Sequence, residues 1–336
     1  MPLMNAVQIA EPGADLVMVQ KEIPEPGERE VLIKVEACGV CHGDAVAKHG
    51  HFPGIAYPRV PGHEVVGIVA ACGPAVTRWK TGARVGVGWS GGYCMTCDAC
   101  AEGDYQSCQD SLITGLSIDG GYAEYMVARA SALVSIPNEL SSVYAAPLLC
   151  AGATTFSALK QSGATGGETV AIHGIGGLGH LAIQYANRLG FRTVALSRGR
   201  EKESLAFKLG AHVYIDTEAS DAAKGLQTLG GARVILCTAP NAKAISGLIN
   251  GLGMGGQLIV VTATSEPLQF LPGQLFRGDH SVKGWHGRRP ADAIDFSMRF
   301  NVMPMIETFP LKRAAEVFDK MMAAKVHFRS VLTMGS

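Results

Sequence analysis

The chain has 336 residues, 47% of them hydrophobic, with 29 basic and 29 acidic side chains and therefore no formal net charge. A chain of this length can bury a large core, and we expect two domains. The zero net charge argues against nucleic acid or an anionic membrane as the main partner.

No continuous apolar run approaches the roughly 18 residues of a transmembrane helix, so we expect no membrane-spanning segment. The first residues lack a basic stretch followed by an apolar core, and we predict no signal peptide. Nine cysteines, six of them in metal-type motifs, are typical of a reducing compartment. We therefore expect a cytoplasmic protein.

Residues 1 to about 150 have the pattern of a β-rich region. Residues 31–35 and 65–69 are β-branched, strand-like runs, and proline and glycine punctuate the segments around them. Residues 145–160 are rich in alanine and leucine and predict a helix.

From residue 169 onward predicted strands alternate with helical stretches, which indicates βαβ units and a parallel sheet. The expected strands are 169–173, 193–197, 213–216, 233–238, 257–262 and 281–284. Two helices, 291–300 and 311–323, and a final strand, 328–333, complete the chain.

Four cysteines lie close together in a loop rich in glycine and polar residues, with the spacing C-x2-C-x2-C-x7-C. They are Cys94, Cys97, Cys100 and Cys108. Four thiolates can surround one tetrahedral zinc and leave no open position, as in structural zinc sites. An iron–sulfur cluster is the alternative metal group, and disulfide pairing is the alternative without a metal.

A second set of possible metal ligands, Cys41, His63 and Cys150, is scattered along the chain. Two thiolates and one imidazole would leave the fourth position of a tetrahedral zinc free for water or substrate, as catalytic zinc requires. Spacing alone cannot establish this set, because isolated cysteines are more often buried apolar residues.

A glycine-rich turn, Gly174-Ile175-Gly176-Gly177-Leu178-Gly179, follows the first of the alternating strands and precedes an apolar helical stretch that ends at Gly190. Strand, turn and helix in this order are the context of the dinucleotide-binding fingerprint. The first glycine allows the tight turn, the second lets the pyrophosphate approach, and the third lets the helix pack on the strand.

About 20 residues after these glycines, NAD-binding sheets usually place an acidic residue that binds the ribose hydroxyls. Here the sequence has Ser197, Arg198, Gly199 and Arg200. Serine and arginine can hydrogen-bond and neutralise a 2′-phosphate, which a carboxylate would repel. We expect a preference for NADP(H), with use of NAD(H) left open; the alternative is that the arginines only solvate a helix start.

Together these motifs resemble those of the zinc-dependent medium-chain dehydrogenase/reductase superfamily, and within it the alcohol dehydrogenases. The resemblance rests on Gly-Val-Cys-His-x-Asp at 39–44, Gly-His-Glu at 62–64, the four-cysteine segment, Cys150, the fingerprint at 174–179 and Arg-Ser-Val-Leu at 329–332. The motifs occur in family order over almost the whole chain, and their joint occurrence is highly specific.

The resemblance implies an α/β protein with two domains. Residues 1–150 and 287–336 would form a catalytic domain with a partly opened GroES-like β-barrel, and residues 151–286 an inserted Rossmann domain with a doubly wound parallel sheet. The cleft between the domains would hold the nicotinamide, the zinc and the substrate. A homodimer or homotetramer is implied as well, and the two ligand sets predict two zinc ions per chain.

The resemblance also assigns roles to single residues. Glu64 would lie beside the metal and exchange onto it, and Asp44 would orient the zinc-bound histidine. His42 and Arg329 would contact the cofactor pyrophosphate, and Thr154 would pack against the nicotinamide.

Gly43 departs from the family pattern, which usually has a serine or threonine that starts a proton relay. Without a hydroxyl the relay is unassigned; a water or another group, such as the nearby His49 and His51, is the alternative. The missing side chain would enlarge the substrate pocket, whereas Trp89 matches an aromatic residue that narrows it. The two residues therefore act in opposite directions on the size of the substrate pocket.

The implied activity is hydride transfer between a nicotinamide cofactor and an alcohol/aldehyde pair by a zinc-dependent alcohol dehydrogenase or aldehyde reductase. A polyol or cinnamyl-alcohol-type reductase on the same scaffold is the alternative enzyme. A non-catalytic zinc-binding family member is the alternative outside enzymes, because fold does not imply function. The intact set of open-site ligands argues against it.

Overall fold

The computed structural model describes residues 2–335. The chain divides into two compact units, Met1–Cys150 with Pro304–Ser336, and Ala151–Met303. The chain returns to the first unit at Pro304, later than the expected residue 287. The reason is that helix α10 (Pro290–Phe300) packs on helix α4 (Ala153–Lys160) of the second unit, with the rings of Phe296 and Phe156 4.8 Å apart.

The first unit is built around a mixed sheet with the strand order β16-β17-β3-β4-β5-β9, and β8 also pairs with β3. The strands are β3 (Glu30–Val40), β4 (Val65–Cys72), β5 (Arg84–Val87), β8 (Tyr125–Arg129), β9 (Leu133–Ser135), β16 (Ile306–Pro310) and β17 (Arg329–Thr333). A separate antiparallel pair, β1 (Leu3–Ile9) and β2 (Leu16–Glu22), packs into the same core. Alternating buried residues along β3 and β8 show that one sheet face covers this core.

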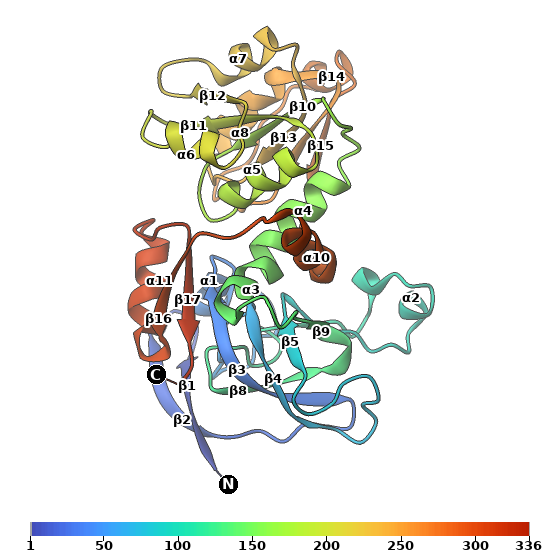
Figure 1. Cartoon of the computed structure of the whole chain (residues 1–336), viewed down its shortest axis with the longest axis vertical. Helices are drawn as coiled ribbons and strands as arrows, with labels where there is room; N and C mark the ends of the chain where they lie inside the picture. Colours follow the sequence, from blue (N-terminus) through green and yellow to red (C-terminus); the bar gives the residue numbers. More distant parts are fainter. Residues whose placement is uncertain (1, 336) are drawn as a thin grey trace. The chain divides into compact units, whose positions relative to one another are not determined.

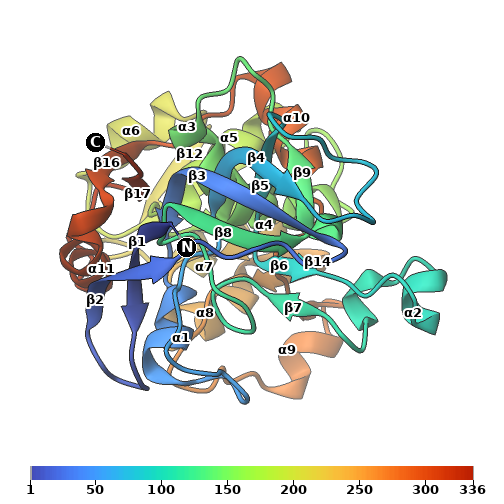
Figure 2. The same cartoon turned by 90° about the horizontal axis from the view of Figure 1, so that it is seen from below.

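Short helices complete the first unit: α1 (Asp44–His49), η2 (Ala130–Ala132), α3 (Ser142–Pro147), η5 (Leu311–Arg313) and α11 (Ala314–Met322). The four-cysteine segment forms a lobe with β6 (Ser90–Gly92), α2 (Asp98–Ala101), η1 (Tyr105–Ser107) and β7 (Leu112–Ile113). Figures 1 and 2 both show α2 at the far end of an arm that projects from the strands of this unit.

The second unit is a six-stranded parallel sheet with the order β12-β11-β10-β13-β14-β15, drawn in Figure 1 with its helices. The strands are β10 (Thr169–His173), β11 (Arg192–Ser197), β12 (Val213–Asp216), β13 (Ala232–Cys237), β14 (Leu252–Val260) and β15 (Ser281–Gly284). Numbered from β10, this is the order 3-2-1-4-5-6 of the Rossmann fold. All six expected strands are present, and the predicted fold class is confirmed.

The helices of the second unit, besides α4 and α10, are α5 (Gly179–Arg188), α6 (Glu203–Lys208), α7 (Ala222–Thr228), α8 (Ala242–Leu248), η4 (Ile249–Gly251) and α9 (Pro272–Phe276). They connect parallel strands, as the alternating pattern predicts. The core between sheet and helices is formed by aliphatic residues such as Val194, Ile235 and Leu258, all fully buried.

One apolar stretch is longer than the sequence suggested. Residues Ser142–Lys160 are helical throughout and, by length and composition alone, could cross a membrane, with a mean hydropathy of 1.3. In the structure 78% of its 18-residue apolar window is buried within the protein, as in the core helix of a globular fold. Its middle, Leu148–Gly152 (η3), is π-helical, directly after Pro147, which has no N–H to donate to the regular helical pattern.

Candidate active site

The first unit brings together four residues that are far apart in the sequence: Cys41, His63, Glu64 and Cys150, here called the candidate catalytic cluster. One donor atom of each lies within 4.8 Å of all the others. Cys41 directly follows β3, and His63 and Glu64 directly precede β4, which is antiparallel to β3. Cys150 comes from the π-helical segment, a local irregularity that often marks functional sites.

The geometry of the cluster fits a metal ion and excludes a disulfide. The sulfurs of Cys41 and Cys150 are 3.9 Å apart, whereas a disulfide needs about 2.05 Å. Tetrahedral zinc with bonds of about 2.3 Å to sulfur separates two thiolates by about 3.8 Å. The Nε2 atom of His63 is buried and has no hydrogen-bond partner within residues 2–335. A buried polar atom without a partner is uncommon, and a metal ligand role accounts for it.

The electrostatics of the cluster favour a thiolate at Cys41. The hydrogen bond with Cys150 lowers the pKa of Cys41 well below its usual value; burial opposes this shift, and the charges of His63 and Arg329 add to it. The thiolate is the form of cysteine that binds metals.

Asp44 holds the imidazole of His63 from the side opposite to the cluster. Its Oδ1 lies 2.8 Å from Nδ1 of His63, and its Oδ2 accepts hydrogen bonds from the Cys41 backbone N–H at 3.0 Å and the Tyr122 hydroxyl at 2.9 Å. A carboxylate at Nδ1 keeps the proton there and leaves the lone pair of Nε2 for a metal. Sequence reasoning missed Tyr122, for which the only local signal is the pair of glycines before it.

Glu64 and Arg329 form a buried ion pair inside the first unit, in which a guanidinium N–H of Arg329 donates to Oε1 of Glu64. Burial raises the pKa of Glu64 to about 7, against the opposing effect of the Arg329 charge. The second carboxylate oxygen, Oε2, is buried and has no hydrogen-bond partner among the described residues. Arg329, expected at the pyrophosphate, therefore contacts Glu64 in this structure.

Gly43 does not open the pocket beside the cluster, contrary to the expectation from sequence. A Cβ at this position would lie 2.7 Å from Cε1 of His63 and 2.9 Å from Cζ3 of Trp89. The Trp89 ring stands edge-on against His63, with 4.8 Å between centroids, and takes up the space. The rings of His49 and His51 lie 5.5 Å apart, and both residues are exposed.

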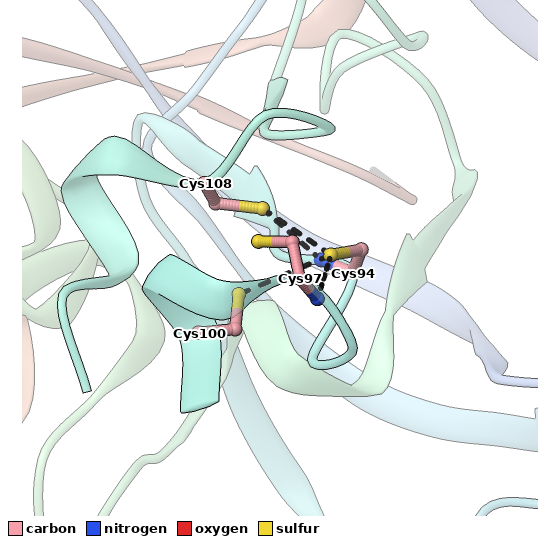
Figure 3. Close-up of side chains that lie close together, drawn as sticks. All are labelled: Cys94, Cys97, Cys100 and Cys108. Carbon is pink, nitrogen blue, oxygen red and sulfur yellow. Dashed lines mark hydrogen bonds between the residues drawn. The ribbon is translucent and has the colours of Figure 1, made fainter. Parts of the chain in front are cut away.

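The four-cysteine lobe forms a second compact ligand set, shown in Figure 3, in which the side chains converge from the loop and from α2. The sulfur of Cys94 lies 3.6 Å from that of Cys108 and 4.0 Å from that of Cys100. All four cysteines are free, so none is in a disulfide. The distances fit one tetrahedral ion better than an iron–sulfur cluster, whose several metal atoms would spread the thiolates apart. Backbone N–H groups of Thr96 and Cys97 bond the sulfur of Cys94 and lower its pKa to about 6.

The glycine-rich turn of the second unit has the geometry that the fingerprint predicts. Gly174 has a φ of +93°, and a Cβ at Gly179 would lie 1.8 Å from the Gly174 carbonyl oxygen. A Cβ at Gly176 would meet nothing within 4 Å, so this glycine faces open space. The turn follows β10, next to β13, where the strand order reverses and such sheets bind their ligands.

Positive side chains gather at the turn after β11. Ser197 ends the strand half-buried, and Arg198 and Arg200 are exposed. Lys202, which sequence reasoning missed although it stands two residues after Arg200, donates from Nζ to the Ile175 carbonyl oxygen at 2.9 Å. It therefore places another positive charge at the fingerprint turn.

Two further residues of the predicted site, His42 and Thr154, and one residue that was not predicted have the following places. His42 is exposed beside Cys41. Thr154 is buried in α4 of the second unit, where a Cβ at Gly287 would lie 2.8 Å from its hydroxyl. Asp216, not predicted, accepts a hydrogen bond from the Gly199 N–H at 2.9 Å at the end of β12.

The first unit carries a cluster of two thiols and an imidazole that leaves one metal position open, and the second unit has the sheet of a dinucleotide-binding domain. Together these features define the class of zinc-type nicotinamide oxidoreductases. Comparisons with known proteins agree. Residues 27–138 match the alcohol dehydrogenase GroES-like domain, and residues 177–301 match the zinc-binding dehydrogenase family. The chain belongs to the alcohol dehydrogenases of the zinc-type medium-chain dehydrogenase/reductase family.

Individual relatives cover almost the whole chain. It is 43% identical to alcohol dehydrogenase notN of Aspergillus sp. (strain MF297-2), over 96% of this chain and 95% of that protein. An alcohol dehydrogenase of Geobacillus stearothermophilus is 41% identical over 98% and 99%. Among solved structures, a cinnamyl alcohol dehydrogenase of Sorghum bicolor is 29% identical with a TM-score of 0.88, covering 99% and 98%. The CAD of Helicobacter pylori, complexed with NADP(H), is 26% identical with a TM-score of 0.86, covering 98% of each chain.

Proposed function

We propose that this protein is an alcohol dehydrogenase or aldehyde reductase in which Cys41, His63 and Cys150 hold the catalytic zinc. The observation that carries the assignment is the convergence of two thiols and the unpartnered Nε2 of a buried histidine at separations that suit one tetrahedral ion. A zinc ion bound there supplies a Lewis acid that polarises the oxygen of an alcohol or carbonyl group.

The side chains of this unit would prepare the site in three ways. Asp44 keeps the proton of His63 on Nδ1 and so aims Nε2 at the ion. Glu64 offers its free Oε2 as an exchangeable ligand while Arg329 holds Oε1. Trp89 provides an apolar wall against the imidazole and excludes water on that side.

The lobe cysteines Cys94, Cys97, Cys100 and Cys108 would hold a second, structural zinc, because four protein ligands leave no position for substrate. Two zinc ions per chain follow from the two sets. The thiolates of both sets need a reducing compartment, which is why we retain a cytoplasmic location.

We infer a preference for NADP(H) over NAD(H). Ser197, Arg198 and Arg200 follow β11, where the 2′ substituent is expected, and Lys202 adds a charge at the fingerprint turn. Nearby acidic residues oppose this: Asp216, Glu203 and Glu218. The carboxylate of Asp216 accepts hydrogen bonds from the backbone N–H groups of Gly199 and Glu218, both at 2.9 Å. The carboxylate of Glu203 lies 3.8 Å from Nε of Arg200.

Steady-state kinetics with both cofactors test the function and the preference together. With an aldehyde panel, we expect turnover and a kcat/KM at least about tenfold higher for NADPH, since one charge-assisted contact is worth about 1.5–3 kcal/mol. Ser197→Asp should reverse the preference, and Arg198→Ala should weaken NADPH use alone. A preference of the unmodified enzyme for NADH would refute the inference that this turn binds a 2′-phosphate. Absence of turnover with every alcohol and aldehyde would refute the assignment as an alcohol dehydrogenase or aldehyde reductase.

A cinnamyl-alcohol-type or polyol reductase is the second candidate, favoured by the similarity to the Sorghum bicolor structure. The chemistry would be the same and only the pocket would differ, so the panel should include cinnamaldehyde and sugar alcohols. A kcat/KM for cinnamaldehyde far above that for short aliphatic aldehydes would select this candidate.

We also propose a homodimer or homotetramer. Strand β15 ends the sheet of the second unit, and all four of its residues are exposed. An open strand edge presents unpaired backbone groups, and a second copy can pair with it about a two-fold axis.

A further inference from the structure

We propose that Tyr122 is a positioning residue of the metal site, which fixes Asp44 and through it the imidazole of His63. This inference rests on the proposed function, because it takes Cys41, His63 and Cys150 to be the zinc ligands. The resemblance to the family assigned no role to this tyrosine.

Two hydrogen bonds connect the tyrosine to the imidazole through the carboxylate of Asp44. The Tyr122 hydroxyl donates to Oδ2 of Asp44 at 2.9 Å, and Oδ1 of the same carboxylate lies 2.8 Å from Nδ1 of His63. The Cys41 N–H also donates to Oδ2, at 3.0 Å. Tyr122, Asp44 and His63 are 0%, 3% and 1% exposed, so water cannot replace a lost donor without entering the core.

The backbone holds Tyr122 directly against the segment that carries His63. Three backbone hydrogen bonds join residues 120–122 to residues 60–62. They run from Gly120 N–H to Val60 O at 2.8 Å, from Gly121 N–H to Gly62 O at 2.9 Å, and from Tyr122 N–H to Pro61 O at 3.0 Å. The tyrosine therefore cannot shift independently of the turn that precedes His63.

Glycine at two positions allows this close approach. A Cβ at Gly62 would lie 2.4 Å from Cδ1 of Tyr122, and a Cβ at Gly120 would lie 2.2 Å from the Gly62 carbonyl oxygen. Gly62 also has a φ of +102°, in the region that favours glycine. The ring thus packs on the turn without a spacer, and its hydroxyl reaches the carboxylate behind the histidine.

The hydroxyl has a function that the ring alone does not provide. Asp44 Oδ2 accepts two donors in a dry site, and removal of one leaves a carboxylate that is less restrained and less well solvated. A less restrained carboxylate holds Nδ1 of His63 less firmly, and outer contacts of this kind set metal affinity. The structure therefore predicts that zinc retention depends on the Tyr122 hydroxyl.

The test compares Tyr122→Phe with a matched control, Tyr185→Phe. Tyr185 is also fully buried, and its hydroxyl bonds Oγ of Ser297 at 2.7 Å in the second unit. We expect Tyr122→Phe to lose the zinc at Cys41, His63 and Cys150 at about tenfold lower chelator concentration than the unmodified protein. Changes to residues that contact metal ligands typically lower metal affinity by about this factor. Its cobalt-substituted form should show a shifted visible absorption band. Tyr185→Phe should change neither readout, even if its Tm falls equally.

A double-mutant cycle with Asp44→Ala separates positioning from simple packing. If Tyr122 acts through Asp44, Tyr122→Phe should have no further effect on zinc retention in the Asp44→Ala background. An undiminished tenfold effect in that background, or identical behaviour of the two phenylalanine variants, would overturn the inference. If the unmodified protein binds no metal at Cys41, His63 and Cys150, the proposed function itself fails, which is a different result.

Discussion

At the scale of single residues, the rings of His63 and Trp89 leave no room for a Cβ at Gly43 where they stand. Gly43→Ser would push a Cβ to within 2.7 Å of His63 and 2.9 Å of Trp89. We expect it to lower kcat/KM by at least about tenfold, because a displacement of a catalytic group by a fraction of an ångström is costly. Adding Trp89→Ala should recover part of the loss, and Trp89→Ala alone should serve as the control. No loss in Gly43→Ser would show that the tryptophan moves freely.

His173 allows a prediction about pH. It ends β10, is 8% exposed, and burial lowers its pKa to about 4. In the unfolded chain the histidine has a pKa of about 6.5, so between pH 6.5 and 4 it is protonated while the folded His173 stays neutral. Protonation therefore favours the unfolded state, and stability is lost as pH falls from about 6.5 to 4. Relative to His173→Gln, the free energy of unfolding should fall by roughly 3 kcal/mol between pH 7 and 4.

Urea unfolding of both proteins across this pH range checks the prediction. Taking the difference between the two proteins removes the contribution of the titrating groups that they share, the cysteines included. A difference that is independent of pH would mean that His173 is protonated in the folded state as easily as in the unfolded chain.

At the scale of elements, the two cysteine sets lie on different kinds of support. The lobe around α2 projects as an arm that buries few of its side chains. Cys100 and Cys108 are buried, whereas Met95 and Tyr105 are exposed. We expect such a segment to depend on the proposed structural zinc in order to fold. Cys150, by contrast, lies in a helix that is anchored by the core, as buried Ala146 and Leu149 show.

We therefore expect different losses from the two cysteine sets. Cys94→Ser should lower stability by about 3–5 kcal/mol and leave much of the turnover per folded molecule. Cys150→Ser should lower turnover by at least about 100-fold, with a small change in Tm. Elemental analysis should find two zinc ions in the unmodified protein and one in each variant.

Cys72→Ser is the control for this pair of variants, because Cys72 is half-buried and belongs to neither set. It should keep both ions. Loss of chemistry without loss of stability in Cys94→Ser would reverse the two assigned roles.

At the scale of the whole molecule, the open edge of the second unit predicts self-association. Val282→Asp would place a charge on β15, and pairing of two copies would bring like charges together. We expect the variant to sediment as a smaller species than the unmodified protein. Val17→Asp on exposed β2 of the first unit is the matched control and should leave assembly unchanged. Equal masses for both variants would exclude this edge as the interface.

The sequence alone determined the class of the protein, because the motifs that define the class consist of residues close together in the chain. The fingerprint at 174–179, the spacing of the four lobe cysteines and the alternation of strands after residue 169 each express chemistry between neighbours in the chain. Strand positions in the second unit were predicted well, since buried parallel strands are short β-branched runs bounded by turns.

Only the tertiary structure decided how distant residues meet. The bond from Tyr122 to Asp44 spans 78 positions, and the ion pair of Glu64 with Arg329 spans 265. The filling of the space beside Gly43 by Trp89 depends on two loops that no spacing relates. Contacts of this kind arise when strands pair and bury polar groups, which must then find partners wherever the fold places them.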